Sequence, residues 1–313
     1  RALASGPGLG FGPGLAPGPA LAPGAALAPG PDLGASGSRP AGRRPARGVR
    51  YRAPVVVTLH NRPVGPRRVQ VIGRLLGRVA AKADATLGVS SDIVQWARSL
   101  GAVAPERALV PARPPGPPAR TPAAVRAELG LPEGAPLLLT VARLAPQKGL
   151  DLLVDVASEL MAPGSGGPRP LLWAVAGEGP ERSRIEARIA AAGAPAVLRG
   201  RRSDLPDLYA AASAVVSTAE WEGQPVALQE ALAAGAPIVA TDAGGTAETL
   251  GAAGLLTRPD AREVRDAIVR VLTQPDLACE LRQRSAARAR QLPTRADLAA
   301  QLWGVYHRCG WRA

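Results

Sequence analysis

The chain has 313 residues, a formal net charge of +13 and 46% hydrophobic residues. This length is enough for two domains of ordinary size. Only two basic residues are lysines, and the arginines are scattered through the chain instead of clustering with aromatic residues, which argues against a base-stacking nucleic-acid surface. We predict no nucleic-acid partner, whereas scattered positive charge is compatible with peripheral contact with an anionic membrane surface.

The two cysteines, Cys279 and Cys309, are far apart and lack metal-ligand spacing. With no recognisable secretory signal, they indicate reduced thiols and a cytoplasmic protein. No segment approaches the ~20 uninterrupted apolar residues that a membrane-spanning helix needs. We therefore expect a protein that lies in the cytoplasm or at the inner face of the membrane.

Residues 1–52 are low in complexity, with proline–glycine repeats followed by a basic run from Arg39 to Arg52. Proline removes backbone donors and glycine raises the entropy of the unfolded chain, so we expect this segment to be disordered. Its glycines do not predict a nucleotide-binding loop, because no strand precedes them and no helix follows.

The next segment, 53–118, predicts part of an α/β domain and a linker. Apolar runs predict strands over 55–59 and 85–89, and helical spacing predicts helices over 69–83 and 91–100. The segment Ser90-Ser91-Asp92 is predicted to cap the second helix. The proline-rich residues 111–122 predict the linker.

From 119 to 292 strands and helices alternate. The predicted strands cover 137–141, 171–176, 197–198, 214–217 and 238–241, and the predicted helices cover 150–160, 181–191, 205–211, 226–234, 246–250 and 263–272. Continuous apolar strands that alternate with helices indicate an α/β fold with a parallel sheet covered on both faces. Ligands of such sheets bind at the carboxyl ends of the strands.

Two basic residues, Arg143 and Lys148, follow the strand over 137–141 and precede a helix. A planar guanidinium, a compact ammonium and the amides at a helix N-terminus together suit a diphosphate. A solvated loop with two basic residues is the alternative. The diphosphate interpretation is favoured because Lys148 is one of only two lysines in an arginine-rich chain.

The turn Gly177-Glu178-Gly179 resembles the start of a dinucleotide-binding fingerprint. Arg182 occupies the place of the third glycine, and a tight strand-to-helix turn explains the other two equally well. We reject the dehydrogenase interpretation.

The most specific pattern places Glu222 in a loop and Glu230 in the first turns of the following helix. Two such carboxylates can accept hydrogen bonds from vicinal hydroxyls, one set on a sugar and one on a ribose. The amides of Gly223 and Gln224 lie between them, at a helix N-terminus that suits a phosphate. A capping glutamate and an unrelated surface glutamate are the alternative.

These motifs, with Thr241-Asp242-Ala243-Gly244-Gly245-Thr246-Ala247-Glu248 after them, occur in the order seen in family 4 glycosyltransferases. From about residue 54 to 290 the chain resembles such an enzyme. The resemblance implies the GT-B fold, in which two Rossmann-like domains face each other across a cleft. It also implies sugar transfer with retention of anomeric configuration and no bound metal or other cofactor.

The resemblance also implies roles for particular residues. Arg143 and Lys148 correspond to the donor-diphosphate ligands, and Glu230 corresponds to the ribose ligand. Glu222 corresponds to the carboxylate at the donor sugar. The remaining donor-site residues would be Gly223, Gln224 and Pro225 beside Glu222, Gly200 and Arg202 at the base, and His60 of the first domain near the reacting sugar. For His60, a histidine that caps a strand is the alternative.

The chain departs from this family at its N-terminal side, where a proline–glycine tract stands in place of the usual strand and glycine-rich loop. We expect an incomplete first domain over 53–118, a donor domain over 119–292, a helix over 293–313 that crosses back, and a sequence truncated or mis-started at its N-terminus. The expected activity is hexose transfer from a UDP- or GDP-sugar to a lipid, glycan or small-molecule hydroxyl. A non-catalytic nucleotide-sugar-binding remnant and an arginine-rich adaptor for nucleic acid or membrane are the alternatives.

Overall fold

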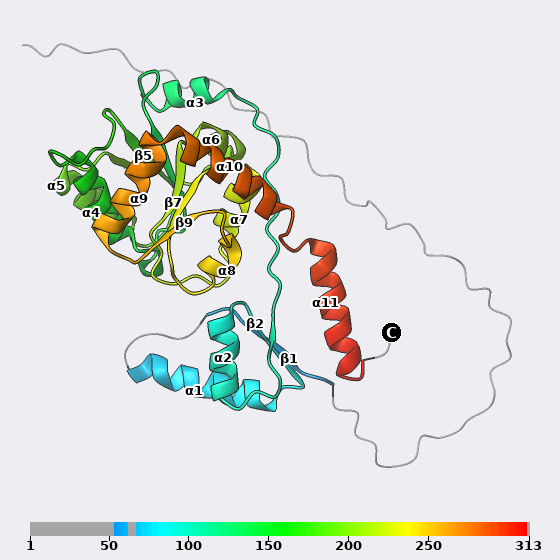
Figure 1. Cartoon of the computed structure of the whole chain (residues 1–313). Helices are drawn as coiled ribbons and strands as arrows, with labels where there is room; N and C mark the ends of the chain where they lie inside the picture. Colours follow the sequence, from blue (N-terminus) through cyan, green and yellow to red (C-terminus); the bar gives the residue numbers. More distant parts are fainter. Residues whose placement is uncertain (1–52, 62–66, 312–313) are drawn as a thin grey trace, which may run out of the picture. The chain divides into compact units, whose positions relative to one another are not determined.

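The computed structural model describes residues 53–61 and 67–311 (Figure 1). The low-complexity segment expected to be disordered, residues 1–52, lies outside these ranges. Within them, all strands belong to two parallel sheets. Among the described residues, we find no helix that is both long and apolar enough to cross a membrane.

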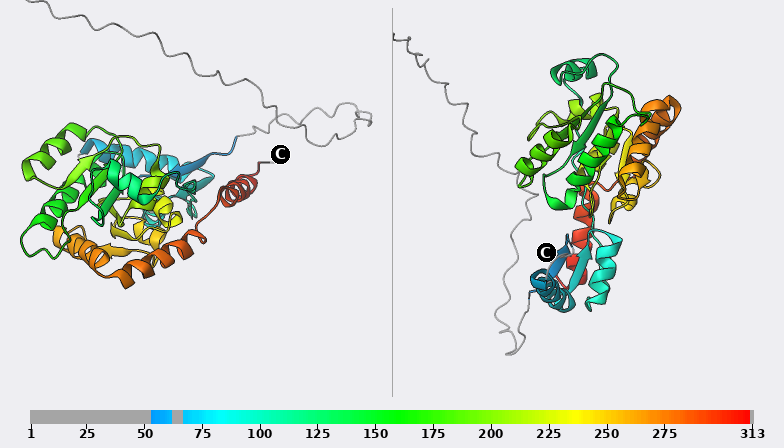
Figure 2. Two further views of the ribbon diagram at one scale, coloured as in Figure 1. Left: turned by 90° about the horizontal axis from the view of Figure 1, so that it is seen from above. Right: turned by 90° about the vertical axis from the view of Figure 1, so that its left-hand side faces the viewer.

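The first sheet has three strands in the order β1-β2-β3. Its elements are β1 (Val56–Leu59), α1 (Arg67–Lys82), β2 (Ala85–Gly88), α2 (Ser91–Ser99) and β3 (Glu106–Arg107). Leu87, Ile93 and Ala97 lie in its core, together with Val305 of α11 (Arg295–Arg308). The C-terminal helix therefore returns to pack on the N-terminal sheet (Figures 1 and 2).

The second sheet has six parallel strands in the order β6-β5-β4-β7-β8-β9. Its strands are β4 (Leu137–Val141), β5 (Leu172–Ala176), β6 (Ala196–Leu198), β7 (Ala214–Ser217), β8 (Ile238–Thr241) and β9 (Leu255–Thr257). Its helices are α3 (Pro122–Glu128), η1 (Pro146–Lys148, a 3-10 turn), α4 (Leu150–Met161), α5 (Arg182–Ala192), α6 (Leu205–Ala211), α7 (Val226–Ala233), α8 (Thr246–Leu250), α9 (Ala261–Thr273) and α10 (Pro275–Ala289).

Both faces of this sheet are buried, as the apolar strands predicted. Along β4, Leu138 faces a core formed with α4, α5 and α9, whereas Leu137 and Leu139 face a second core formed with α3, α6 and α7. The strand order reverses between β4 and β7, because β5 and β6 extend the sheet on one side and β8 and β9 on the other. The connections that follow β4 and β7 therefore lead to helices on opposite faces of the sheet, α4 and α7. Such a switch point places a crevice at the carboxyl ends of these strands.

The sequence missed β3, α3, β9 and α10. β3 and β9 have only two and three residues, too few for an apolar period to be visible. The proline-rich linker concealed α3, although Thr121 accepts a hydrogen bond from Ala124 and Pro122 occupies the first turn, which is a normal helix start. Within the predicted capping segment Ser90-Ser91-Asp92, Ser90 is the N-cap of α2, but its hydroxyl donates to Asp92 and does not bond a backbone amide of the first turn.

Residues 108–121, here called the strap, connect the two sheets and are held by side chains from the part of the chain that forms the second sheet. The amides of Val110 and Ala112 donate to the Gln224 and Gln229 side chains at 2.9 and 3.0 Å. The amide of Ala119 donates to Asp207 at 2.6 Å. Hydrogen bonds at several points along the strap restrict its motion, so the strap is a fixed part of the structure.

Candidate functional site

A cavity of about 750 Å³ lies at the carboxyl ends of β4 and β7, where the strand order reverses. Its lining comes from the loops after β4, β5, β6 and β7 and from the end of β1. Nine of the ten residues selected from the sequence line this one cavity: His60, Arg143, Lys148, Arg202, Glu222, Gly223, Gln224, Pro225 and Glu230. Residues from distant parts of the chain therefore converge on a single space of ligand size.

The loop after β4 is pressed against the loop after β7. Gly149 has φ of 58°, and a Cβ at this position would lie 1.9 Å from the carbonyl oxygen of Thr218. Only glycine tolerates this conformation together with this approach. The same close approach brings Lys148, the residue before Gly149, next to Glu222, and both side chains line the cavity.

Lys148 and Glu222 form an ion pair, with side chains 20% and 14% exposed. Both charges are mostly removed from water and each depends on the other. Arg143 is different: it is exposed, and within the described ranges its side chain has no ion pair or hydrogen bond. Its guanidinium is therefore available to a ligand, whereas the Lys148 ammonium would be shared between a ligand and Glu222.

Glu230 lines the same cavity from the second turn of α7. Its Oε2 accepts a hydrogen bond of 3.1 Å from the hydroxyl of Tyr209 on α6. Burial raises the pKa of the Glu230 carboxyl, and the hydrogen bond from Tyr209 acts in the opposite direction. The carboxylate is thus partly desolvated and strengthened as an acceptor for the hydroxyls of a ligand.

Gln224 contributes differently from its carboxylate neighbours. Its side chain points to the strap and to the first sheet, where its amide donates to the carbonyl oxygen of Val89 at 2.8 Å and accepts from Val110. Gly223 lies against the same region, since a Cβ there would be 2.5 Å from Val89. The loop that carries Glu222 is therefore seated on the first sheet, and only the backbone of Gln224 remains for a ligand.

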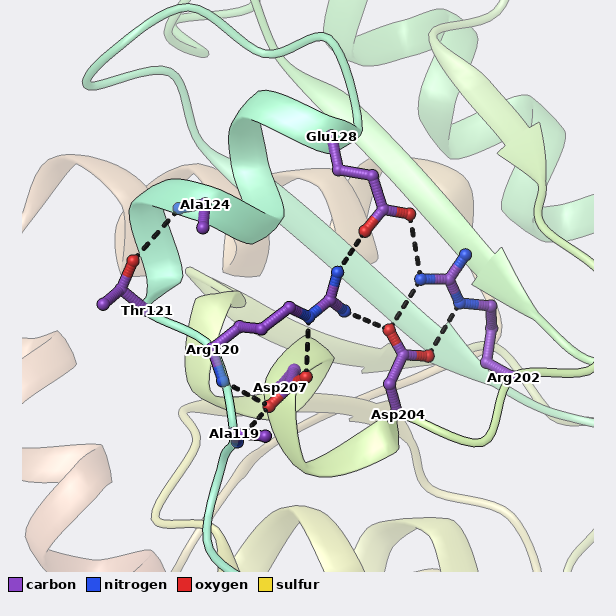
Figure 3. A network of polar contacts seen from close by, with 8 residues as sticks. All are labelled: Ala119, Arg120, Thr121, Ala124, Glu128, Arg202, Asp204 and Asp207. Atoms are coloured by element: carbon purple, nitrogen blue, oxygen red, sulfur yellow. Dashed lines mark hydrogen bonds and ion pairs between the residues drawn. The ribbon is translucent and has the colours of Figure 1, made fainter.

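Arg202 lines the cavity near the end of β6 and belongs to a network of ion pairs shown in Figure 3. Its guanidinium bonds Asp204 and Glu128, and Arg120 of the strap bonds the same two carboxylates and Asp207. These contacts fix the orientation of Arg202 and neutralise much of its charge. Because its charge is paired, Arg202 can contact a ligand at this end of the cavity through its planar guanidinium surface but not as a free cation.

Gly200 is not among the residues that line the cavity. It has φ of 71°, and its carbonyl oxygen accepts a hydrogen bond of 2.7 Å from the amide of Gly177. This bond joins the ends of β5 and β6, so Gly200 supports the neighbouring turn. His60 is exposed at the end of β1 and lines the cavity together with Asn61.

Sequence reasoning missed Tyr209 and Trp221. Trp221 lines the cavity, and its indole donates to Asp92 at 2.9 Å, which ties the Glu222 loop to α2. Trp221 directly precedes Glu222 in the sequence, so its place in the site could have been predicted from this neighbour. Tyr209 had no such signal, because its contact with Glu230 spans 21 residues and two elements.

The chain matches one family model and is similar to several characterised glycosyltransferases. The model of the family described as "Glycosyl transferases group 1" matches residues 123–292, which is more than half of the chain. The chain is 31% identical over 203 residues to the alpha-D-kanosaminyltransferase of Streptomyces kanamyceticus, covering 60% of this chain and 49% of that protein.

A second relative, the GDP-mannose-dependent alpha-mannosyltransferase of Mycobacterium tuberculosis, is 35% identical over 116 residues, which cover 36% of this chain and 27% of that protein. The chain thus spans about half or less of the length of these two relatives. The structure of Anabaena Alr3699/HepE in complex with UDP and glucose superimposes with a TM-score of 0.69 at 21% identity, covering 81% of this chain and 71% of that one.

Proposed function

Because the chain belongs to the group 1 glycosyl transferase family and has the GT-B fold, we propose that it transfers a hexose from a nucleotide-diphosphate sugar, with retention of configuration, to a hydroxyl of a lipid, glycan or small molecule. The observation that carries this proposal is the convergence of Arg143, Lys148, Glu222 and Glu230 on one cavity.

Arg143 and Lys148 would act on the leaving group. Breaking the bond between the sugar and the diphosphate develops negative charge on the diphosphate while the sugar becomes oxocarbenium-like. Cations already placed where this charge appears lower the barrier, and one such donor is typically worth ~3 kcal/mol. Arg143 can supply a planar fork to the two phosphates, and Lys148 a compact charge.

The ion pair between Lys148 and Glu222 suggests how the site prepares for its substrate. A diphosphate that approaches Lys148 competes with Glu222 for the ammonium group. As Lys148 turns to the diphosphate, Glu222 becomes free to accept a hydrogen bond from a hydroxyl of the donor sugar and to favour its positive character. Glu230 would hold the ribose hydroxyls, with Arg202 beside the base.

His60 and Asn61 reach the cavity from the first sheet. They would lie near the reacting sugar, and the acceptor hydroxyl would attack from the face that the diphosphate leaves. Because two side-chain cations are assigned to the diphosphate charge, we propose that catalysis requires no metal. Activity should then persist after dialysis against EDTA, and its loss with recovery on adding Mg²⁺ or Mn²⁺ would contradict this part of the proposal.

The donor can be tested by thermal shift against UDP- and GDP-sugars, both of which the comparisons support: one relative is named for GDP-mannose, and the Anabaena structure contains UDP. A ligand at 100 times its Kd adds about 2.7 kcal/mol to stability, which raises Tm by about 5–10 °C for a chain of this size. No shift with any nucleotide sugar or nucleoside diphosphate would refute the proposal. Binding without transfer or hydrolysis would instead support the non-catalytic remnant.

A peripheral contact with an anionic membrane is also part of the proposal. Its support is α1, on which Val71, Ile72, Leu75 and Val79 are each at least half exposed. Arg74 and Arg78 lie on the same helix and are also exposed. A helix with exposed apolar and basic side chains can lie in the interface of a membrane that contains anionic lipids.

A further inference from the structure

Tyr209 is a buried tyrosine next to the proposed donor site. The residue is 1% exposed, and its side chain packs in the core between the second sheet and α7. Its hydroxyl lies 3.1 Å from Oε2 of Glu230 and 3.1 Å from the carbonyl oxygen of Ala227, both on α7. Tyr209 itself does not line the cavity, whereas Glu230 does.

The hydroxyl has one proton and faces two acceptors. Burial raises the pKa of Tyr209, so the phenol stays protonated and acts as a donor. An ionised carboxylate is a stronger acceptor than a peptide carbonyl, so the proton is directed to Glu230. This bond occupies Oε2 and restricts the carboxylate to one orientation, leaving Oε1 as the acceptor for a ligand in the cavity.

We propose that Tyr209 is a positioning residue for ribose recognition: by holding Oε2 of Glu230, it presents the other carboxylate oxygen to the vicinal hydroxyls of the donor ribose. The proposal rests on the assignment of Glu230 as the ribose ligand under the proposed function. It also specifies the donor class, since a carboxylate held in this way favours ribonucleoside diphosphates over 2′-deoxynucleoside diphosphates. A phenyl ring would fill the same core, so packing alone does not account for the hydroxyl.

The test compares Tyr209→Phe with the wild type by calorimetric titration of UDP and GDP and of their 2′,3′-dideoxy counterparts. Loss of one hydrogen bond corresponds to about 3- to 10-fold in affinity. We expect Kd for the ribonucleotide to rise by about this factor, while Kd for the dideoxynucleotide changes less than twofold. Tyr306→Phe is the matched control, because Tyr306 is 39% exposed on α11, and it should change neither value.

A double-mutant cycle gives the second measurement. In a Glu230→Gln background the ribose preference should already be reduced, and adding Tyr209→Phe should reduce it no further, because both changes remove the same oriented acceptor. Equal weakening of ribo- and dideoxynucleotides by Tyr209→Phe would show a general structural role and overturn the proposal. So would an unchanged ribose preference in a variant whose Tm matches the wild type.

The wild type separates this proposal from the one on which it rests. If the wild type binds neither UDP nor GDP, the proposed function fails and the inference fails with it. If the wild type prefers the ribonucleotide and Glu230→Gln removes the preference while Tyr209→Phe does not, the proposed function stands and only the role of Tyr209 is refuted.

Discussion

Arg143 and Lys148 occupy one loop, yet their surroundings differ. Arg143 is exposed, whereas the Lys148 ammonium is paired with Glu222 in a mostly buried position. An exposed side chain contributes little to stability. Removing one member of a largely buried ion pair leaves a charge with no partner. Substituting Arg143 should therefore lower activity without lowering stability, whereas substituting Lys148 should lower both.

We predict that Arg143→Ala and Lys148→Ala each lower kcat/KM by about 100- to 1,000-fold, the range for loss of one preorganised charge donor. Arg143→Ala should leave Tm within about 1 °C of the wild type, because at an exposed site the free-energy change is small. Lys148→Ala should lower Tm by several degrees, since about 1–2 kcal/mol corresponds to about 2–8 °C. Steady-state kinetics and thermal melts check both. Similar losses of Tm in the two variants, with activity retained, would contradict the assignment.

At this scale the sequence predicts residue types better than side-chain directions. Glu222, Lys148 and Glu230 were selected because carboxylates and cations beside strand ends suit a sugar and a diphosphate, and all three line the cavity. Gln224 lies in the same segment, yet its side chain faces the strap. Gln229 and Glu230 are neighbours on α7, yet Gln229 bonds the strap and Glu230 lines the cavity. Which side chain faces the strap depends on contacts with residues more than 100 positions away.

Among the elements, the strap departs most from expectation, because proline-rich linkers are usually semi-rigid spacers without side-chain partners. Its Arg120 joins Asp207, Asp204 and Glu128 in the network of Figure 3. The guanidinium of Arg120 holds the pKa of Asp207 and Glu128 below their usual range, and Arg202 does so for Asp204. The strap is thereby tied to the wall of the cavity that Arg202 lines.

This network predicts a pH-dependent contribution to stability. Carboxylates whose pKa is lower in the folded state stabilise it above their ordinary pKa, near 4, and this stabilisation is lost as the pH falls through the folded value. Arg120→Gln should therefore lower Tm at pH 7, and the difference from the wild type should shrink below about pH 4. Arg258→Gln is the control, because Arg258 is 83% exposed and its pair with Glu263 is on the surface. A Tm difference for Arg120→Gln that stays constant from pH 7 to pH 3 would contradict this role.

The regular βα units of the second sheet were predictable from the sequence. The strands over 137–141, 214–217 and 238–241 have the predicted bounds. Each is a short apolar run that is buried on both faces, and such a run can be recognised in the sequence without knowing which elements pack against it. The strap could not be predicted in this way, because its conformation comes from hydrogen bonds to Gln224, Gln229 and Gln301 in other elements. β3 could not be predicted either, because its two residues are extended only through their pairing with β2.

For the whole molecule, α1 supplies the surface on which membrane contact can be tested. Val71, Leu75 and Val79 recur every four residues and so lie along one side of the helix. Each is at least 50% exposed. Arg74 and Arg78 follow the neighbouring row, which gives positive charge beside the apolar side chains.

We predict that the protein co-sediments with vesicles containing phosphatidylserine and only weakly with phosphatidylcholine vesicles. Leu75→Gln with Val79→Gln should reduce this binding several-fold, because both changes remove apolar area that would be buried in the interface. Val103→Gln is the control: Val103 is 77% exposed but lies outside α1. Equal binding by the wild type and the double variant, or no binding to either vesicle, would refute membrane contact through α1.

The reversal of strand order between β4 and β7 has a consequence for how such a protein can diversify. The residues assigned to the diphosphate and the donor sugar follow β4 and β7, the two adjacent central strands of the second sheet. The acceptor would enter from the other half of the molecule. Substitutions or insertions there could exchange one acceptor for another while the means of holding an activated sugar stays intact.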